Sequence, residues 1–221
     1  MMGADDGRPM ILYGSHLSTY TTKVRLALRL RGIAYEQRLP EGGYGSAAWR
    51  AQLPTGTVPA LEHEGFFLAE SEAILEYLED VFESHPLRPI DPRERARARW
   101  IARLHDTQFE PRLRLLFPLL KEPSRRAALT PLRQDLQDRL DRIAALITPA
   151  PWMAGAQFSL ADCGFAVSLP LAERILESLG EPLRWPQALQ PWREAWQEYD
   201  ALQAALLEWR QAVDHWIAPQ K

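Results

Sequence analysis

Residues 58–71 read VPALEHEGFFLAES, and this stretch decides how the first part of the chain folds. A proline donates no backbone hydrogen bond, so Pro59 belongs at the first residue of a strand, at an edge or at a bulge. Short apolar runs on either side of the turn-like segment 62–65 predict a strand, a tight turn and a second strand. Residues 71–82 then switch to helical spacing, with Ser71 at the N-cap position. An acid, Glu70, and a hydroxyl, Ser71, at the start of a helix fit a small-ligand site.

The residues before this stretch predict a βαβ unit. MILYG at 10–14 reads as a strand, KVRLALRLRG at 23–32 as a helix that ends at Gly32, and IAYEQRLP at 33–40 as a second strand. The two strands should be parallel, because a helical crossover joins them. Segment 41–57 is rich in glycine and turn residues, with one short helical turn around Trp49. The order predicts a small mixed sheet with helices on its faces.

The second part of the chain has a different pattern. ESHPLRPIDP at 83–92 holds three prolines and reads as a linker. Asp91 as N-cap, Pro92 at the first helical position and Glu94 at the third predict a helix start. No convincing strand follows. We therefore expect a first domain at 10–83, a linker at 84–91 and an all-helical domain at 92–221.

Composition excludes several classes of protein. The 221 residues carry a net charge of −3, which gives no reason to expect binding to nucleic acid or to an anionic membrane. The arginines at 93, 95, 97 and 99 step by two, which scatters them around a helix. No apolar stretch approaches the length of a membrane span, and the single cysteine favours a reducing compartment. These two features lead us to expect a cytoplasmic protein. The five histidines show no metal-ligand spacing, so we expect no metal site.

A βαβ–ββα domain joined through a proline linker to an all-helical domain resembles the cytosolic glutathione transferases. The resemblance covers nearly the whole chain and implies a two-domain α+β/α protein: a thioredoxin-like N-terminal domain and an all-α C-terminal domain. It implies a homodimeric transferase for detoxification that uses glutathione and a small electrophile. The helix from Asp91 would contribute to the dimer contact.

VPALEHEGFFLAES carries the strongest part of the resemblance. In the family the Val-Pro bond is cis, and the loop presents the valine backbone to the cysteinyl amide groups of glutathione, which implies this role for Val58 and Pro59. The γ-glutamyl group of glutathione bears an ammonium and a carboxylate on one carbon. Glu70 can pair with the ammonium, and the Ser71 hydroxyl with the amides at the helix start can hold the carboxylate.

LSTYTTKVRLAL at 17–28 carries the second part of the resemblance. It implies that Ser18 is the thiol-activating residue, as in the serine-type classes (zeta, theta and tau). Thr19 resembles the second hydroxyl of the zeta motif, whereas Tyr20 replaces its cysteine. Tyr13, at the end of the first strand, is a rival phenol of the kind that tyrosine classes use.

Other positions complete the expected sites. Leu53-Pro54 and Thr57 depart from residues common in the family, which leaves Gln52 and Thr57 as candidates for holding the glycyl carboxylate. We expect the second-substrate pocket between the domains, with candidate residues His16, Tyr20, Trp100, Leu104, His105 and Phe109. Ser159 and Asp162 form a capping box at the start of a buried helix, and their role is structural.

Three functions remain open from the sequence. The favoured one is a glutathione transferase that passes the glutathione thiolate to a small hydrophobic electrophile. The second is a zeta-class enzyme like maleylacetoacetate isomerase, which uses glutathione as a cofactor. The third is a non-catalytic binding protein of the same fold, such as stringent starvation protein A.

Overall fold

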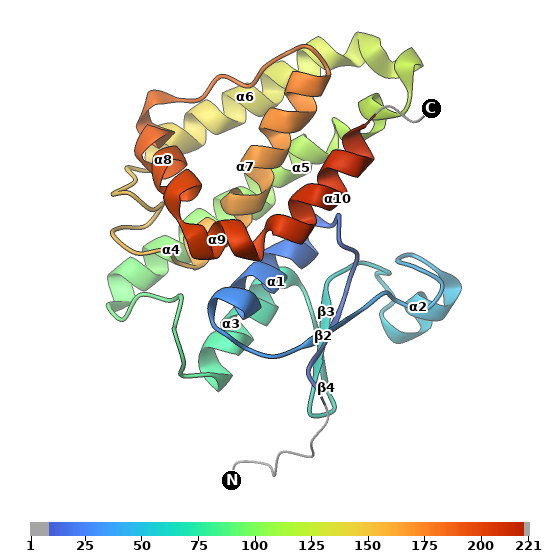
Figure 1. The fold of residues 1–221 in the computed structure, drawn as a ribbon, viewed down its shortest axis with the longest axis vertical. Helices are drawn as coiled ribbons and strands as arrows, with labels where there is room; N and C mark the ends of the chain where they lie inside the picture. The colour runs from blue at the N-terminus through green and yellow to red at the C-terminus, as the bar shows by residue number, and fades with distance from the viewer. Residues whose placement is uncertain (1–8, 219–221) are drawn as a thin grey trace. The chain divides into compact units, whose positions relative to one another are not determined.

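The computed structural model of the protein describes residues 9–218, the side chain of Pro123 excepted. The chain divides into two compact units, Met1–Pro86 and Leu87–Lys221 (Figure 1). The elements of the first unit are β1 (Ile11–Tyr13), α1 (Thr19–Leu30), β2 (Glu36–Arg38), α2 (Ala47–Gln52), β3 (Ala60–His63), β4 (Phe66–Ala69) and α3 (Ser71–Val81).

The strand order in the sheet is β2-β1-β3-β4. β1 pairs in parallel with β2 and antiparallel with β3, and β3 pairs antiparallel with β4. The predicted βαβ unit and hairpin are thereby confirmed. The hairpin turn is Glu64-Gly65, with φ of 50° and 78°, which is the left-handed backbone that two-residue hairpin loops require.

The sheet has helices on both faces (Figure 1). α1 and α3 cover one face, where Leu12 and Leu61 of the sheet are fully buried with Val24 of α1 and Ile74 of α3. α2 lies on the other face, where Trp49 packs against Tyr13 and Phe67. The order of elements predicted helices on the faces of the sheet, and both faces can bury side chains because alternate strand residues point to opposite faces.

All regular elements in the described part of the second unit are helices, and loops join them; an isolated bridge pairs Trp152 with Gly155. Its elements are α4 (Pro92–Leu104), a π-helical segment η1 (His105–Phe109), α5 (Glu110–Arg114), 3-10 segments η2 (Phe117–Leu120) and η3 (Pro123–Ala128), α6 (Leu129–Leu146), α7 (Leu160–Ser178), 3-10 segment η4 (Gln187–Leu189), α8 (Gln190–Glu198), α9 (Asp200–Ala205) and α10 (Leu207–Ile217).

Local sequence signals set where these helices begin. Asp91 caps α4 by accepting hydrogen bonds from the amides of Arg93 (2.9 Å) and Glu94 (3.0 Å), as the sequence predicts. α7 is the central helix, since 15 of its 19 residues are buried. A Cβ at Gly164 would lie 2.4 Å from Nδ1 of His105, so glycine is needed where α7 meets η1.

Asp162, fully buried in the first turn of α7, joins three segments of the helical unit. Its Oδ2 accepts from the amide (2.9 Å) and hydroxyl (3.0 Å) of Ser159, which completes the capping box. Its Oδ1 accepts from the amide of Met153 (2.8 Å) and from Nε1 of Trp192 in α8 (2.9 Å). Burial raises the pKa of this carboxyl to about 6, although the four hydrogen bonds act in the opposite direction.

Asp162→Asn should lower the free energy of unfolding by about 2–4 kcal/mol at neutral pH, because an amide nitrogen would face two buried donors. The raised pKa also gives a pH dependence. The protonated form of Asp162 stabilises the folded state. Its contribution to the free energy of unfolding, about 3 kcal/mol, is fully present below the unfolded pKa near 3.8 and is lost as the pH rises to about 6. Urea titrations from pH 4 to pH 7.5 measure both effects.

The matched control is Asp138→Asn, since Asp138 is an exposed aspartate on α6. It should change neither the midpoint at pH 7.5 nor the slope of stability against pH. Equal midpoints for Asp162→Asn and the parent protein would show that the buried carboxylate does not hold the helical unit together.

Candidate functional site

Strand register brings the ends of three loops to one edge of the sheet. Tyr13, the last residue of β1, lies opposite Ala60, the first residue of β3. Ala60 in turn lies opposite Ala69, the last residue of β4. The loop after β1, the Val58-Pro59 segment and the Glu70-Ser71 segment therefore all reach this edge.

Val58 presents unpaired backbone groups at this edge. The Val58–Pro59 peptide bond is cis, and Pro59 is buried. Within residues 9–218, neither the N–H nor the C=O of Val58 has a hydrogen-bond partner. The preceding residue is held differently, since the carbonyl of Thr57 accepts from Nε1 of Trp49 at 2.9 Å. A backbone donor and acceptor side by side fit the amide of an extended peptide.

Glu70 and Ser71 differ from the expected arrangement. The sequence predicted Ser71 as the N-cap of α3, but Glu70 occupies that position, with φ of 71° and no capping side chain. Ser71 is the first helical residue and is 5% exposed. A left-handed glutamate is uncommon and marks strain of the kind that binding sites retain.

The start of α3 is consequently open to a ligand. Its first amide with an intrahelical bond is that of Ile74, which donates to the Glu70 carbonyl at 2.9 Å. In the described part of the chain no partner is found for the amides of residues 71–73, the Ser71 hydroxyl or the Glu70 carboxylate. Orphan amides and a hydroxyl at a helix N-terminus bind carboxylates, and the Glu70 carboxylate suits an ammonium.

Ser18 is the N-cap of α1. Its Oγ accepts from the amide of Thr21 at 3.2 Å, and its backbone carbonyl accepts from the amide of Thr22 at 2.8 Å. The hydroxyl has one hydrogen to donate, and no acceptor for it is found among the described residues. Ser18 is half-buried, so this donor can reach a bound group.

The rival hydroxyls are placed differently. The Tyr13 phenol donates to Oε2 of Glu62 at 3.0 Å on the face that α2 covers. Burial, together with Glu62, raises the pKa of Tyr13. Thr19, the first residue of α1, is 2% exposed.

Sequence reasoning missed Arg50 of α2, which is the only lysine or arginine between Arg38 and Arg88. Its Nε donates to the carbonyl of Gly45 (3.1 Å), and its Nη1 donates to those of Pro54 (3.2 Å) and Thr55 (3.3 Å). The predicted candidates near it are exposed: Gln52 ends α2, and the Thr57 hydroxyl contacts that of Thr55. The signal was available, since this segment contains no other side chain with a permanent positive charge.

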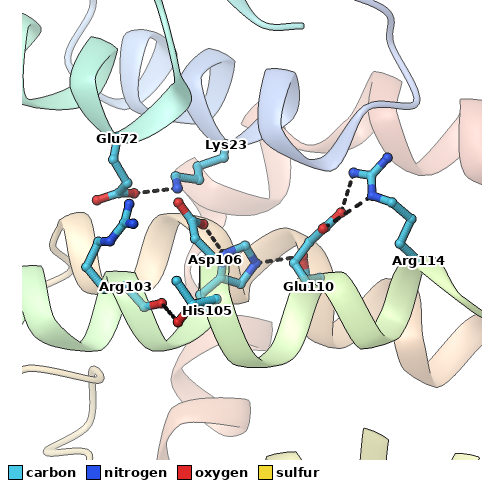
Figure 2. A network of polar contacts seen from close by, with 9 residues as sticks. Lys23, Glu72, Arg103, His105, Asp106, Glu110 and Arg114 are labelled. Carbon is cyan, nitrogen blue, oxygen red and sulfur yellow. Dashed lines mark hydrogen bonds and ion pairs between the residues drawn. The ribbon is translucent and has the colours of Figure 1, made fainter. Parts of the chain in front are cut away.

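A buried ion pair involves the residue that follows Ser71. Lys23 of α1 is 1% exposed and pairs with Glu72, the residue after Ser71 (Figure 2). The Lys23 ammonium also lies 5.8 Å from the centre of the Tyr20 ring. The pair joins the N-terminal halves of α1 and α3, and losing one partner would leave an uncompensated buried charge.

The residues expected at the second-substrate pocket fall into two groups. His16 is exposed and Tyr20 half-buried in the first unit, while Trp100 is 43% exposed and Leu104 half-buried on α4.

His105 and Phe109 lie instead in the core of the helical unit, at 1% and 0% exposed. The Nδ1 atom of His105 lies 2.7 Å from Oδ1 of Asp106 (Figure 2). Its Nε2 atom lies 2.8 Å from Oγ of Ser168. The side chains of His105 and Phe109 are thus both buried within the helical unit.

A cavity of about 360 Å³ lies at the opposite end of the sheet, among Met10, Ile33, His63 and Phe82. It contains none of the predicted site residues. Among the described residues no cluster of histidine, cysteine or acid side chains fits a metal ion, and no helix is long and apolar enough to cross a membrane.

Comparison with known proteins shows the family of this chain. A family model described as the N-terminal domain of glutathione S-transferase matches residues 12–86. The chain is 32% identical to a glutathione S-transferase of Pseudomonas putida strain F1 over 174 residues, which cover 74% of this chain and 75% of the relative. The chain therefore belongs to the glutathione S-transferase family, whose transferases take glutathione as a substrate.

Two further relatives represent the alternatives. A stringent starvation protein A homologue of Pasteurella multocida is 30% identical over 170 residues, or 76% of each chain. A solved maleylacetoacetate isomerase of Methylobacterium extorquens AM1, with bound malonate and GSH, superposes with a TM-score of 0.65 at 26% identity. That alignment covers 88% of this chain and 95% of the other.

Proposed function

We propose that this protein is a glutathione transferase that passes the thiolate of glutathione to a small hydrophobic electrophile. The observation that carries the proposal is the set of unpartnered polar groups at one edge of the sheet. They are an acid, a hydroxyl with helix amides, and a backbone donor and acceptor. Their order matches the γ-glutamyl and cysteinyl parts of glutathione.

Each part of glutathione has a partner in this arrangement. Glu70 pairs with the γ-glutamyl ammonium, and Ser71 with the orphan amides of α3 holds the neighbouring carboxylate. The Val58 backbone pairs with the cysteinyl amide groups. Arg50 takes the glycyl carboxylate, because its Nη2 has no partner within residues 9–218, and Gln52 and Thr57 lie beside it.

Ser18 activates the thiol by donating its hydroxyl hydrogen to the sulfur. A free thiol near pKa 8.5 is only a few per cent thiolate at neutral pH, so stabilising the thiolate raises the reactive fraction. The N-terminus of α1 places positive potential behind the sulfur. The free hydrogen of Ser18 supports this role over Tyr13, whose hydrogen is committed to Glu62.

The isomerase remains the second candidate, because the related isomerase structure holds GSH and the resemblance implies a serine of the zeta type at Ser18. A turnover panel with glutathione separates the candidates. It contains 1-chloro-2,4-dinitrobenzene, maleylacetone, an organic hydroperoxide and a disulfide. Turnover of the first substrate supports the transferase, and turnover of maleylacetone alone supports the isomerase. Silence on all four supports a binding protein related to stringent starvation protein A.

Glu70→Gln and Ser71→Ala should each weaken glutathione binding at least several-fold, since truncating a charge-assisted contact costs about 2–4 kcal/mol where it is desolvated. Calorimetric titration measures the affinity. Glu64→Gln is the matched control, because Glu64 is also exposed and left-handed but lies in the hairpin turn at the other end of the sheet. Unchanged affinity in folded Glu70→Gln and Ser71→Ala proteins would refute the binding site.

Ser18→Ala should lower turnover about tenfold to a thousandfold, which is the scale for losing one transition-state donor. The pH–rate profile should move to higher pH as the thiol pKa rises, while glutathione affinity stays close to that of the parent. Steady-state kinetics between pH 5.5 and 9 measure these effects.

Two kinds of control separate the roles of Ser18. Ser18→Asp keeps the N-cap but places a carboxylate against the sulfur, so turnover should fall although α1 remains capped. Tyr13→Phe and Thr19→Val should retain most of the turnover. If Ser18→Ala is fully active and Tyr13→Phe is not, the activating hydroxyl is the phenol.

We also propose that the chain forms a homodimer through the region of α4. Exposed apolar side chains flank its exposed arginines, with Ile90 at 90% and Trp100 at 43% exposed. Light scattering at micromolar concentration should give twice the 25.3 kDa chain mass. A monomer at that concentration would contradict the proposal.

A further inference from the structure

The cavity of about 360 Å³ lies at the end of the sheet opposite the candidate site, and its lining has a mixed character. Met10, just before β1, and Ile33, just after α1, are its buried apolar residues. The rings of His63, which ends β3, and Phe82, which follows α3, lie 5.5 Å apart between centroids. Glu64 of the hairpin turn also lines the cavity and is exposed. A volume of this size suits a small molecule.

Hydrogen bonds hold the aromatic side of this cavity in place. Arg31, which is 2% exposed, donates through Nε to the carbonyl of Ser84 at 3.2 Å and through Nη2 to the carbonyl of Phe82. Nδ1 of His63 lies 2.8 Å from the hydroxyl of Tyr77 in α3. The backbone that carries Phe82 and the ring of His63 are therefore fixed before any ligand arrives.

The charges around the cavity favour a cation. The Glu64 carboxylate has no ion-pair partner within residues 9–218. Burial and, to a smaller extent, the charge of Glu64 raise the pKa of Tyr77, so the negative potential of this carboxylate reaches the aromatic side chains. No lysine or arginine is among the described residues that line the cavity. The nearby Arg31 is itself compensated by Glu79 at 3.1 Å.

Two helices end beside this cavity and add to its negative potential. α1 ends at Leu30 and α3 at Val81, and lining residues of the cavity follow each of these ends. The carbonyl groups at a helix C-terminus carry partial negative charge and attract cations. α3 has no basic residue in its last turn. Arg29, in the last turn of α1, donates instead to the hydroxyl of Tyr35 at 3.3 Å and does not line the cavity.

We propose that this cavity binds a small organic cation, in which an ammonium or quaternary ammonium group is attached to an apolar body. The cation lies against the ring of Phe82 and beside Glu64, and the apolar body covers Met10 and Ile33. The inference goes beyond the transferase function and does not depend on it. The 12 residues of α1 span about 18 Å between the two sites, whereas charges in physiological salt are screened over about 8 Å. The cation and glutathione should therefore bind independently.

The test is calorimetric titration with benzyltrimethylammonium, benzyl alcohol and benzoate, which share a phenyl group and differ in charge. Only the cation should bind saturably, with one site per chain, and added salt should weaken it. Glu64→Gln and Phe82→Leu should each weaken its binding about two- to fivefold, on the scale of one solvent-accessible charge or cation–π contact. Glu70→Gln is the control, because it removes the exposed carboxylate at the other end of the sheet and should leave the affinity for the cation unchanged.

Other outcomes overturn the inference. They are equal affinity for the three probes, no binding of benzyltrimethylammonium, or unchanged binding in Glu64→Gln. This variant decides the test if Phe82→Leu does not fold, since Glu64 is exposed. Displacement of the cation by glutathione, or its loss in Glu70→Gln, would place it at the glutathione site and also overturn the inference. Glutathione affinity is measured separately, so the proposed function and this inference can fail independently of each other.

Discussion

The pairing of Tyr13 with Ala60, and of Ala60 with Ala69, is the constraint on which the candidate site depends. Beyond that row the Gly14 amide still donates to the Arg38 carbonyl of β2 (2.9 Å), whereas the Val58 backbone groups and the first amides of α3 have no partner among residues 9–218. A shift by one residue would turn Leu12 and Leu61 away from the core, so burial enforces the register. The stability of the sheet thus determines where unpaired polar groups meet.

Buried charges fix the helices behind this edge. Arg31 near the end of α1 pairs with Glu79 of α3 at 3.1 Å and donates to the carbonyls of Phe82 and Ser84. Lys23 pairs with Glu72 at the other end of the same two helices. A buried ion pair adds little net stability over an apolar pair of equal volume, but losing one partner is costly. The two ion pairs therefore determine how α1 and α3 align, and they add little to the free energy of unfolding.

The helical unit is organised by a single carboxylate instead of an ion pair. Asp162 receives four hydrogen bonds from three segments, and a carboxylate is the one small group that accepts that many at once. Its cost is desolvation, which the raised pKa records. The buried ring of His105 likewise has a hydrogen-bond partner at each nitrogen, Asp106 and Ser168.

The sequence by itself determined the order of elements, the parallel βαβ unit, the hairpin after Pro59 and the starts of α4 and α7. These features depend on local signals: short apolar runs bounded by turn residues, helical periodicity, Asp91-Pro92 and the Ser159–Asp162 capping box. Only the tertiary structure decided that Glu70 is left-handed, that Tyr13 donates to Glu62 while the Ser18 hydrogen stays free, and that His105 is buried while His16 is exposed. Each of these depends on which distant groups share a hydrogen bond or exclude water. Such pairing follows from packing between elements, which local sequence does not encode.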